Sequence, residues 1–173
     1  MTRLSASVDL PADVAVPTYD RSVTSRGIVH LDVSPLNVLV QSPGAGVQPP
    51  HFKISDFGIS VLLCEGVLLS RPPDHWAHLP PELLLPGSRR PTPRCDLYGL
   101  GLTLLLALSG SVPLTNALPL SVVERQVLQG LPSQQAAQLT SPLGPFIARL
   151  LQVSPEDRYG SALEAWRALK DLG

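Results

Sequence analysis

The first part of the chain carries no regular alternation of apolar and polar positions. Residues 1–26 contain Pro11 and Pro17 and show no sustained period of 3.6, so we expect an irregular segment there. The pattern changes after this segment. Val38-Leu39-Val40 is a short, mostly β-branched run, Phe52-Lys53-Ile54 alternates apolar and polar residues, and the stretch between them is rich in glycine and proline. This arrangement predicts one small β-hairpin.

Helical signals dominate the rest of the chain. Residues 97–108 (LYGLGLTLLLAL) form the most apolar stretch, which is about half the roughly 20 residues that a membrane-spanning helix needs. We therefore expect a buried helix that starts near Asp96, and no membrane span. Ser121-Val-Val-Glu124 and Ser161-Ala-Leu-Glu164 have the spacing of capping boxes and predict two helix starts. Gly130 and Ser141-Pro142 predict a helix end and a further start.

The predicted elements make the chain mainly α with a small β-hairpin. Composition and charge fit one globular domain. The 173 residues are 44% hydrophobic and 16% charged, and the net charge of -1 provides no electrostatic basis for binding nucleic acid or an anionic membrane. The two cysteines, Cys64 and Cys95, are not arranged as CxxC, and the N-terminal residues do not resemble a secretory leader. We therefore expect reduced thiols and an intracellular protein, in the cytoplasm or the nucleus.

Polar residues flank the predicted hairpin along the chain, before its first strand and after its second. Asp32 and Asn37 precede its first strand, and Asp56 follows its second strand. Transfer of a phosphoryl group to a hydroxyl needs a carboxylate that accepts the hydroxyl proton, together with hard oxygen ligands for Mg²⁺. These three residues would supply one base and two metal ligands. Taken separately, each carboxylate is better explained as an ordinary loop residue that caps a turn.

The order of these residues resembles the protein kinase superfamily. His30-x-Asp32 followed by Asn37 is similar to the catalytic-loop motif H-R-D-x-x-x-x-N, and Asp56-Phe57-Gly58 matches the D-F-G motif. Three later motifs follow in the family's order: Pro80-Pro81-Glu82 resembles A-P-E, Asp96 to Gly101 resembles the start of the long buried helix, and Arg158 resembles the late arginine of the family. One such motif recurs by chance, but five in this order are typical of the C-terminal lobe (C-lobe) of a kinase.

The resemblance implies a protein kinase-like C-lobe of the α+β type over residues 27–173. Within this lobe it places the catalytic loop at 30–37, the D-F-G motif at 56–58, the activation segment at 58–82 and a helical subdomain at 96–173.

The resemblance also implies a role for each motif residue. Asp32 would be the catalytic base, Asn37 a ligand of the second metal ion, and Asp56 the main Mg²⁺ ligand that bridges the phosphates of ATP. Glu82 and Arg158 would form a largely buried ion pair. The remaining motif residues would be structural: His30, Phe57, Gly58 and Asp96.

Two positions depart from the usual kinase pattern. Leu31 stands where most regulated kinases carry an arginine that pairs with a phosphorylated activation segment. The hydroxyl residues of that segment are Ser60 and Ser70, with no threonine or tyrosine, so we expect no dependence on its phosphorylation. Ser34 stands where cellular serine/threonine kinases have lysine, and with Asn37 retained, the loop is similar to that of the protein kinases of beta- and gammaherpesviruses.

Residues 1–29 contain no Gly-rich loop, no V-A-I-K lysine and no helix-C glutamate, so we expect the N-terminal lobe (N-lobe) to be absent from this chain. The predicted function is that of a serine/threonine protein kinase, present as a C-lobe fragment, with ATP and Mg²⁺ as cofactors. Its predicted partners are a protein substrate and a missing N-lobe or partner kinase, and a viral protein would act in the host nucleus.

The alternative is a catalytically inactive, pseudokinase-like binding or regulatory module. A helical protein with chance motifs is a third hypothesis, which predicts no effect of Mg²⁺ on stability. A zinc site at His75-x-x-His78 with Cys64 is disfavoured, because no matched second pair of ligands accompanies the two histidines.

Overall fold

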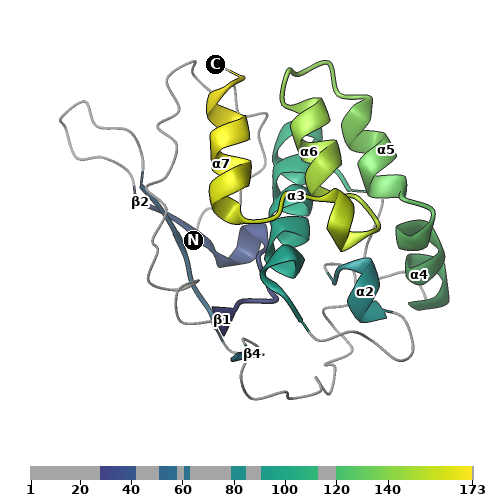
Figure 1. Cartoon of the computed structure of the whole chain (residues 1–173), viewed down its shortest axis with the longest axis horizontal. Helices are drawn as coiled ribbons and strands as arrows, with labels where there is room; N and C mark the ends of the chain where they lie inside the picture. Colours follow the sequence, from purple (N-terminus) through teal and green to yellow (C-terminus); the bar gives the residue numbers. More distant parts are fainter. Residues whose placement is uncertain are drawn as a thin grey trace.

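A computed structural model describes residues 28–41, 51–57, 61–62, 79–84, 91–112 and 120–172 of the chain. Helices form most of this part, and two short antiparallel strand pairs accompany them (Figure 1). The expected mainly helical fold with a small hairpin is therefore confirmed. The helices are α2 (Pro81–Leu84), α3 (Pro93–Ser109), α4 (Leu120–Leu128), α5 (Leu131–Ala137), α6 (Gly144–Leu150) and α7 (Ala162–Lys170). The strands are β1 (Ile28–Val29), β2 (Val38–Gln41), β3 (His51–Ile54) and β4 (Val61–Leu62), and two 3-10 turns are η1 (Pro35–Asn37) and η3 (Pro155–Asp157).

Some of the sequence predictions concern residues that the structure does not describe. The expectations for residues 1–26, for Gly58 and for Cys64, His75 and His78 lie outside the described residues.

The predicted hairpin is formed by β2 and β3. The two strands are antiparallel, and their register pairs Val38 with Ile54 and Val40 with Phe52. Because side chains alternate between the two faces of a strand, these four apolar residues share one face of the hairpin. Val40, Phe52 and Ile54 on this face remain exposed. The other strand pair, β1 with β4, is shorter and is also antiparallel.

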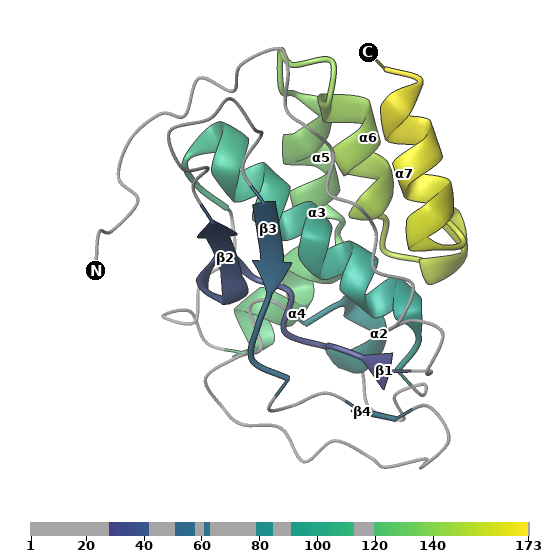
Figure 2. The same cartoon turned by 90° about the vertical axis from the view of Figure 1, so that its left-hand side faces the viewer.

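Helix α3 occupies the centre of the molecule, between the hairpin and the group formed by α5, α6 and α7 (Figure 2). Thr92 precedes it with an extended backbone, Pro93 fills its first turn, and Gly110 ends it in the left-handed region with φ 71°. Proline at the first helical position and glycine just after the last are both favoured by backbone geometry. The apolar stretch 97–108 therefore forms the buried helix that the sequence predicted, with its start close to Asp96.

Helix α3 also needs glycine where it meets its neighbours. A Cβ atom on Gly99 would lie 2.8 Å from the carbonyl oxygen of Val33, and one on Gly101 would lie 2.8 Å from Cγ of Leu151. Both distances are shorter than van der Waals contact, so the two glycines let α3 approach the loop after β1 and the end of α6. No helix in the described ranges is long and apolar enough to cross a bilayer.

The predicted helix ends were right in two places. The Ser161 hydroxyl accepts a hydrogen bond from the Glu164 amide at 3.1 Å, as a capping box requires, although Glu164 accepts from the Gly160 amide one residue further upstream. Gly130, with φ 68°, follows the end of α4 as predicted.

Two other predicted starts were wrong. Helix α4 already includes Leu120, so Ser121 lies in its first turn and is not its cap. Helix α6 begins at Gly144 and not directly after Ser141, because the Ser141 hydroxyl accepts from the Leu143 amide and closes a turn ahead of the helix.

Candidate functional site

The loop from His30 to Asn37 is held by helix α3. The Asp96 carboxylate accepts hydrogen bonds from the backbone amides of His30 at 2.9 Å and Leu31 at 2.8 Å. Leu31 is buried and has φ 66°, a left-handed conformation that costs a non-glycine residue roughly 1–2 kcal/mol. The two bonds to a carboxylate offset this strain. Burial raises the pKa of Asp96, and the His30 and Leu31 amides act against that rise.

The same face of α3 also contacts the loop further along. The Val33 carbonyl approaches Gly99 closely, and the Thr103 hydroxyl lies 3.4 Å from the same carbonyl oxygen. Leu31 and Val33 are buried, whereas Asp32 between them is only partly buried. The contacts with α3 therefore keep two apolar side chains inside the core and direct the intervening carboxylate toward the surface.

Asp32 and Asn37 are directly bonded to each other. The Asn37 side-chain amide nitrogen donates to the Asp32 carboxylate oxygen Oδ2 at 2.7 Å and to the Asp32 backbone carbonyl at 2.9 Å. The turn η1 makes this possible, because the Asn37 backbone amide donates to the Ser34 carbonyl at 3.0 Å and folds the chain back. With its nitrogen directed at Asp32, Asn37 keeps its amide oxygen Oδ1 as a potential cation ligand.

The end of β3 is bonded to this loop through Ser55. The Ser55 backbone amide and hydroxyl both donate to the Asn37 carbonyl oxygen, at 2.8 Å and 3.1 Å. The Ser55 carbonyl in turn lies 3.1 Å from Nε2 of His30. Asp56, the next residue, is exposed and has φ 63°, and Phe57 packs on the His30 ring with a centroid separation of 4.5 Å. Both neighbours of Asp56 therefore contact the 30–37 loop.

His30 links the two segments with both of its ring nitrogens. The Asp32 backbone amide donates to Nδ1 at 3.2 Å, so the ring carries its proton on Nε2 and donates it to the Ser55 carbonyl. The hydrogen bonds thus form a closed ring: Asp32 to His30, His30 to Ser55, Ser55 to Asn37 and Asn37 to Asp32.

The predicted site residues are therefore brought together as far as the structure describes them. His30, Asp32, Asn37, Asp56 and Phe57 lie at one end of the β2–β3 hairpin. Ser55 was missed by the sequence analysis. The signal that could have identified it is a hydroxyl residue directly before Asp56, at the end of the second strand.

The donor set at this end of the hairpin fits a magnesium ion bound together with phosphates. Asp56 offers carboxylate oxygens and Asn37 an amide oxygen, both hard ligands, whereas Asp32 is the expected base. Within the described residues no group of three or more histidine, cysteine, aspartate or glutamate side chains could hold a metal by itself. Mg²⁺ characteristically uses only one or two protein carboxylates and completes its shell with phosphate oxygens and water, so this sparse set is suited to it.

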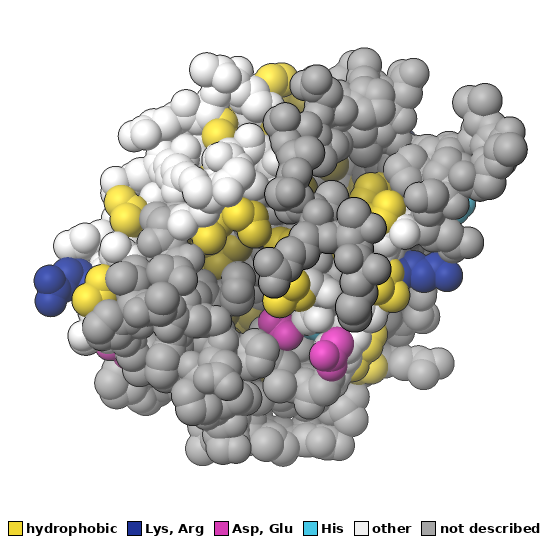
Figure 3. All heavy atoms as spheres, turned by 180° about the vertical axis from the view of Figure 1, so that it is seen from behind, with side chains coloured by type: hydrophobic (Ala, Val, Ile, Leu, Met, Phe, Trp, Pro, Cys, Tyr) yellow, Lys and Arg dark blue, Asp and Glu magenta, His cyan; other side chains and the backbone are white. Residues whose placement is uncertain are grey.

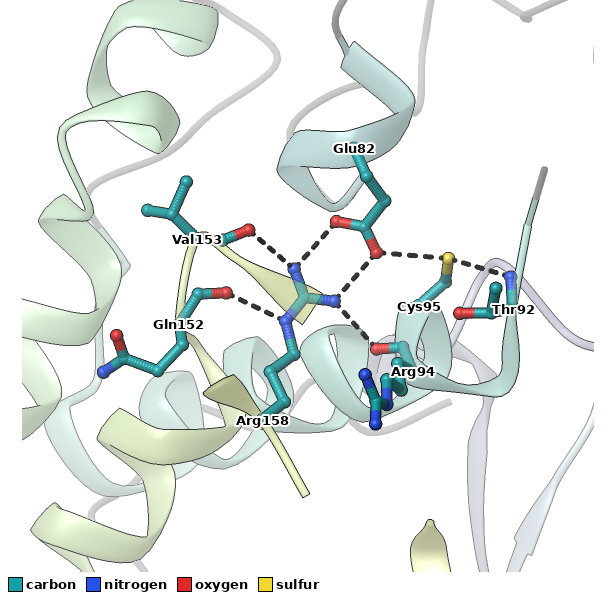
Figure 4. Close-up of polar contacts among 7 residues, drawn as sticks. All are labelled: Glu82, Thr92, Arg94, Cys95, Gln152, Val153 and Arg158. Atoms are coloured by element: carbon teal, nitrogen blue, oxygen red, sulfur yellow. Dashed lines mark hydrogen bonds and ion pairs between the residues drawn. The ribbon is translucent and has the colours of Figure 1, made fainter. Parts of the chain in front are cut away.

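A second polar cluster, the Glu82–Arg158 ion pair, lies in the core (Figure 4). The two terminal guanidinium nitrogens of Arg158 donate to the two carboxylate oxygens of Glu82, each at 2.8 Å. The side chains are 0% and 6% exposed. The remaining guanidinium donors reach three backbone carbonyls: Gln152 at 2.8 Å, Arg94 at 2.9 Å and Val153 at 3.2 Å. All five N–H donors of the arginine are thereby used.

Cys95 extends this cluster. Its thiol donates to the Glu82 carboxylate at 3.3 Å and accepts from the Thr92 amide at 3.4 Å (Figure 4). Burial and the charge of Glu82 raise the pKa of Cys95 to about 12. The ion pair therefore ties three separate segments together: α2, the start of α3 and the 152–158 turn.

Comparison with known proteins was consistent with the motif order. The protein kinase domain family model matches residues 22–169. The chain is 32% identical over 126 residues to sperm motility kinase Z of Mus musculus, 28% over 140 residues to the serine/threonine-protein kinase STE20 of Eremothecium gossypii, and 29% over 144 residues to the serine/threonine-protein kinase PknB of Mycobacterium leprae. These matches cover 71%, 78% and 80% of this chain but only 24%, 13% and 22% of the relatives. The chain thus spans a quarter or less of their length.

Proposed function

This chain belongs to the protein kinase domain family, and from that premise we propose that it acts in ATP-dependent phosphoryl transfer to serine or threonine hydroxyls of a protein substrate. One observation carries the proposal: a ring of hydrogen bonds joins Asp32, His30, Ser55 and Asn37 at one end of the hairpin, directly before Asp56. The proposed base, Asp32, and the proposed metal ligands, Asn37 and Asp56, are in this ring or next to it. Serine/threonine kinases among its relatives support the choice of substrate hydroxyl.

In the proposed reaction, Asp32 accepts the proton of the substrate hydroxyl. The Asn37 amide that donates to Oδ2 orients the Asp32 carboxylate, and this leaves Oδ1 for the incoming proton. Asp56 and the side-chain oxygen of Asn37 would hold Mg²⁺, which neutralises charge on the phosphates of ATP. The expected structural role of Asp96 follows from its bonds to the amides of His30 and Leu31, since these bonds fix the backbone on which Asp32 stands.

Position 31 bears on how the site would be regulated. Leu31 is a core residue that packs beneath the loop, so this position presents no cation to a phosphorylated activation segment. This supports the proposal that activity does not depend on phosphorylation of that segment. Ser34 is buried as well. The likeness of this loop to the herpesvirus kinases, and with it a location in the host nucleus, stays a prediction.

We extend the proposal to a partner. Val40, Phe52 and Ile54 are exposed on one face of the hairpin that ends at the site. Hydrophobic and acidic side chains lie side by side on the face shown in Figure 3. Contiguous exposed apolar residues are characteristic of interaction surfaces. Since the relatives are several times longer than this chain, we propose that an N-lobe, from the same gene product or from a partner kinase, covers this surface and completes the ATP site.

The test is thermal unfolding with and without Mg·ATP. At a ligand concentration of 100 times Kd, binding stabilises the folded state by about 2.7 kcal/mol, and for a chain of this size this raises Tm by roughly 5–10 °C. Asp56→Asn should lose most of this gain. Asparagine tolerates the left-handed backbone of Asp56 and removes only the charge.

Asp157→Asn is the matched control, because it neutralises an exposed carboxylate in η3, and it should keep the full shift. A wild-type chain that Mg·ATP does not stabilise would instead support either the inactive binding-module alternative or a C-lobe fragment whose ATP site is incomplete without an N-lobe.

A further inference from the structure

We propose that Ser55 is a positioning residue for the two metal ligands, acting through its side-chain hydroxyl. This inference rests on the proposed function, because it assigns to Ser55 the role of fixing the position of Asp56 relative to Asn37. The hydroxyl and the backbone amide of Ser55 donate to the same acceptor, the carbonyl oxygen of Asn37. Asp56 directly follows Ser55 in the chain, and the carbonyl oxygen that accepts both bonds belongs to Asn37. Ser55 therefore joins the backbones of the two proposed metal ligands.

The backbone geometry of Asp56 explains why such a contact is needed. The left-handed region is disfavoured for a non-glycine residue, so Asp56 at φ 63° stays in this conformation only if its surroundings hold it. These surroundings include the contacts of Ser55 with Asn37 and His30, and that of Phe57 with the His30 ring. Loss of the Ser55 hydroxyl would therefore weaken one of the contacts that hold the backbone next to Asp56.

The hydroxyl is the only part of this contact that depends on the residue type. Any residue at position 55 other than proline could donate its backbone amide to Asn37, but only serine or threonine adds a hydroxyl donor on its Cβ atom. The effect of the hydroxyl can therefore be isolated by comparing Ser55→Ala, which removes it, with Ser55→Thr, which keeps it.

Ser133→Ala is the matched control. The Ser133 hydroxyl donates to the Ala148 carbonyl at 2.9 Å, a bond of the same kind between α5 and α6, and it also accepts from the Gln152 side chain at 3.0 Å. Deleting it weakens the fold without touching residues 30–37 or 55–57. A change seen in Ser55→Ala but not in Ser133→Ala is therefore specific to the site.

The first measurement is calorimetric binding of a non-hydrolysable ATP analogue to the full chain over a series of Mg²⁺ concentrations. One hydrogen bond contributes a net 0.5–1.5 kcal/mol, so we expect the Kd of Ser55→Ala to rise about two- to ten-fold. The increase in Kd should be largest at limiting Mg²⁺, because the loss of the hydroxyl changes the relative position of the proposed metal ligands. Ser55→Thr should restore the wild-type Kd, and Ser133→Ala should not change it.

The second measurement needs no nucleotide. In Ser55→Ala the protection factor of the residue 55 amide against hydrogen exchange should fall about two- to ten-fold, since its bond to Asn37 loses the support of the neighbouring hydroxyl. The proposal is overturned if this protection is unchanged, or if Ser55→Ala binds the analogue with the wild-type Kd at every Mg²⁺ concentration. If the wild-type chain fails to bind the analogue, this chain forms no ATP site without an N-lobe, and the exchange comparison still decides whether the hydroxyl holds this backbone.

Discussion

Replacing Glu82 by alanine would leave the Arg158 guanidinium buried without its counter-charge. The Arg158 side chain is 0% exposed, so water cannot take the place of the carboxylate unless the core opens. Breaking a buried pair by removing one partner typically costs about 3–5 kcal/mol. The carbonyls of Gln152, Arg94 and Val153 still accept from the guanidinium, which moderates the loss. We therefore expect a destabilisation of about 3 kcal/mol, at the lower end of the range.

The comparison variant is Asp32→Ala. Asp32 is only partly buried, and its carboxylate accepts a hydrogen bond from Asn37, so its removal should cost about 1–2 kcal/mol. For a chain of this size, 1 kcal/mol shifts Tm by about 2–4 °C. Glu82→Ala should accordingly lower Tm by roughly 6–12 °C, and Asp32→Ala by roughly 2–8 °C. Thermal and urea unfolding followed by circular dichroism measure both changes.

A third variant tests the physical reason for the loss. Arg158→Met replaces the charged side chain with an apolar one of similar length, and in combination with Glu82→Ala no charge remains to be stranded. The double variant should therefore be more stable than the sum of the two single losses implies, by at least about 1 kcal/mol. Equal Tm values for Glu82→Ala and Asp32→Ala, or strictly additive losses in the double variant, would refute the reasoning.

Three further predictions concern helix α3. Gly99→Ala should destabilise the chain by about 1–3 kcal/mol, because its Cβ would lie 2.8 Å from the carbonyl oxygen of Val33, and chemical denaturation would show the loss. Tyr98→Phe should leave stability unchanged or raise it by up to about 1 kcal/mol, because the buried hydroxyl has no hydrogen-bond partner among the residues that the structure describes; a loss above 1 kcal/mol in the same assay would contradict this. In a Cys64→Ser background, Cys95 should not react with a thiol reagent at pH 8 until the chain unfolds, because a pKa of about 12 leaves roughly one thiol in ten thousand ionised; rapid native-state labelling would show that the thiol is not buried as described.

Short-range patterns in the sequence predicted the local structure where the signal and its partner lie close together. The hairpin of β2 and β3 follows from two apolar runs with a glycine- and proline-rich stretch between them, and the Ser161 cap bonds to an amide three residues away. The same reasoning failed at Ser121 and Ser141. A helix can start before a residue that could cap it, as at Ser121, or after a further turn, as at Ser141.

The candidate site likewise combines features that the sequence indicated with features that only the folded chain shows. The sequence by itself indicated which residues to propose as base and metal ligands, because Asp32, Asn37 and Asp56 keep the spacing and order of the kinase motifs. Only the tertiary structure decided how they are held. Asp96 binds amides more than 60 positions away, and Ser55 binds a backbone carbonyl that any residue could offer.

The Glu82–Arg158 ion pair includes contacts that the sequence motifs suggested and contacts that only the fold reveals. The motif order suggested Glu82 and Arg158 as partners, but the carbonyls of Arg94, Gln152 and Val153 that use the remaining donors have no side-chain signature. Backbone groups are the same at every position, so only the folded chain shows which of them meet. The sequence therefore determined which side chains are candidates for the site, and the packing of α3 against the 30–37 loop decided how that loop is held.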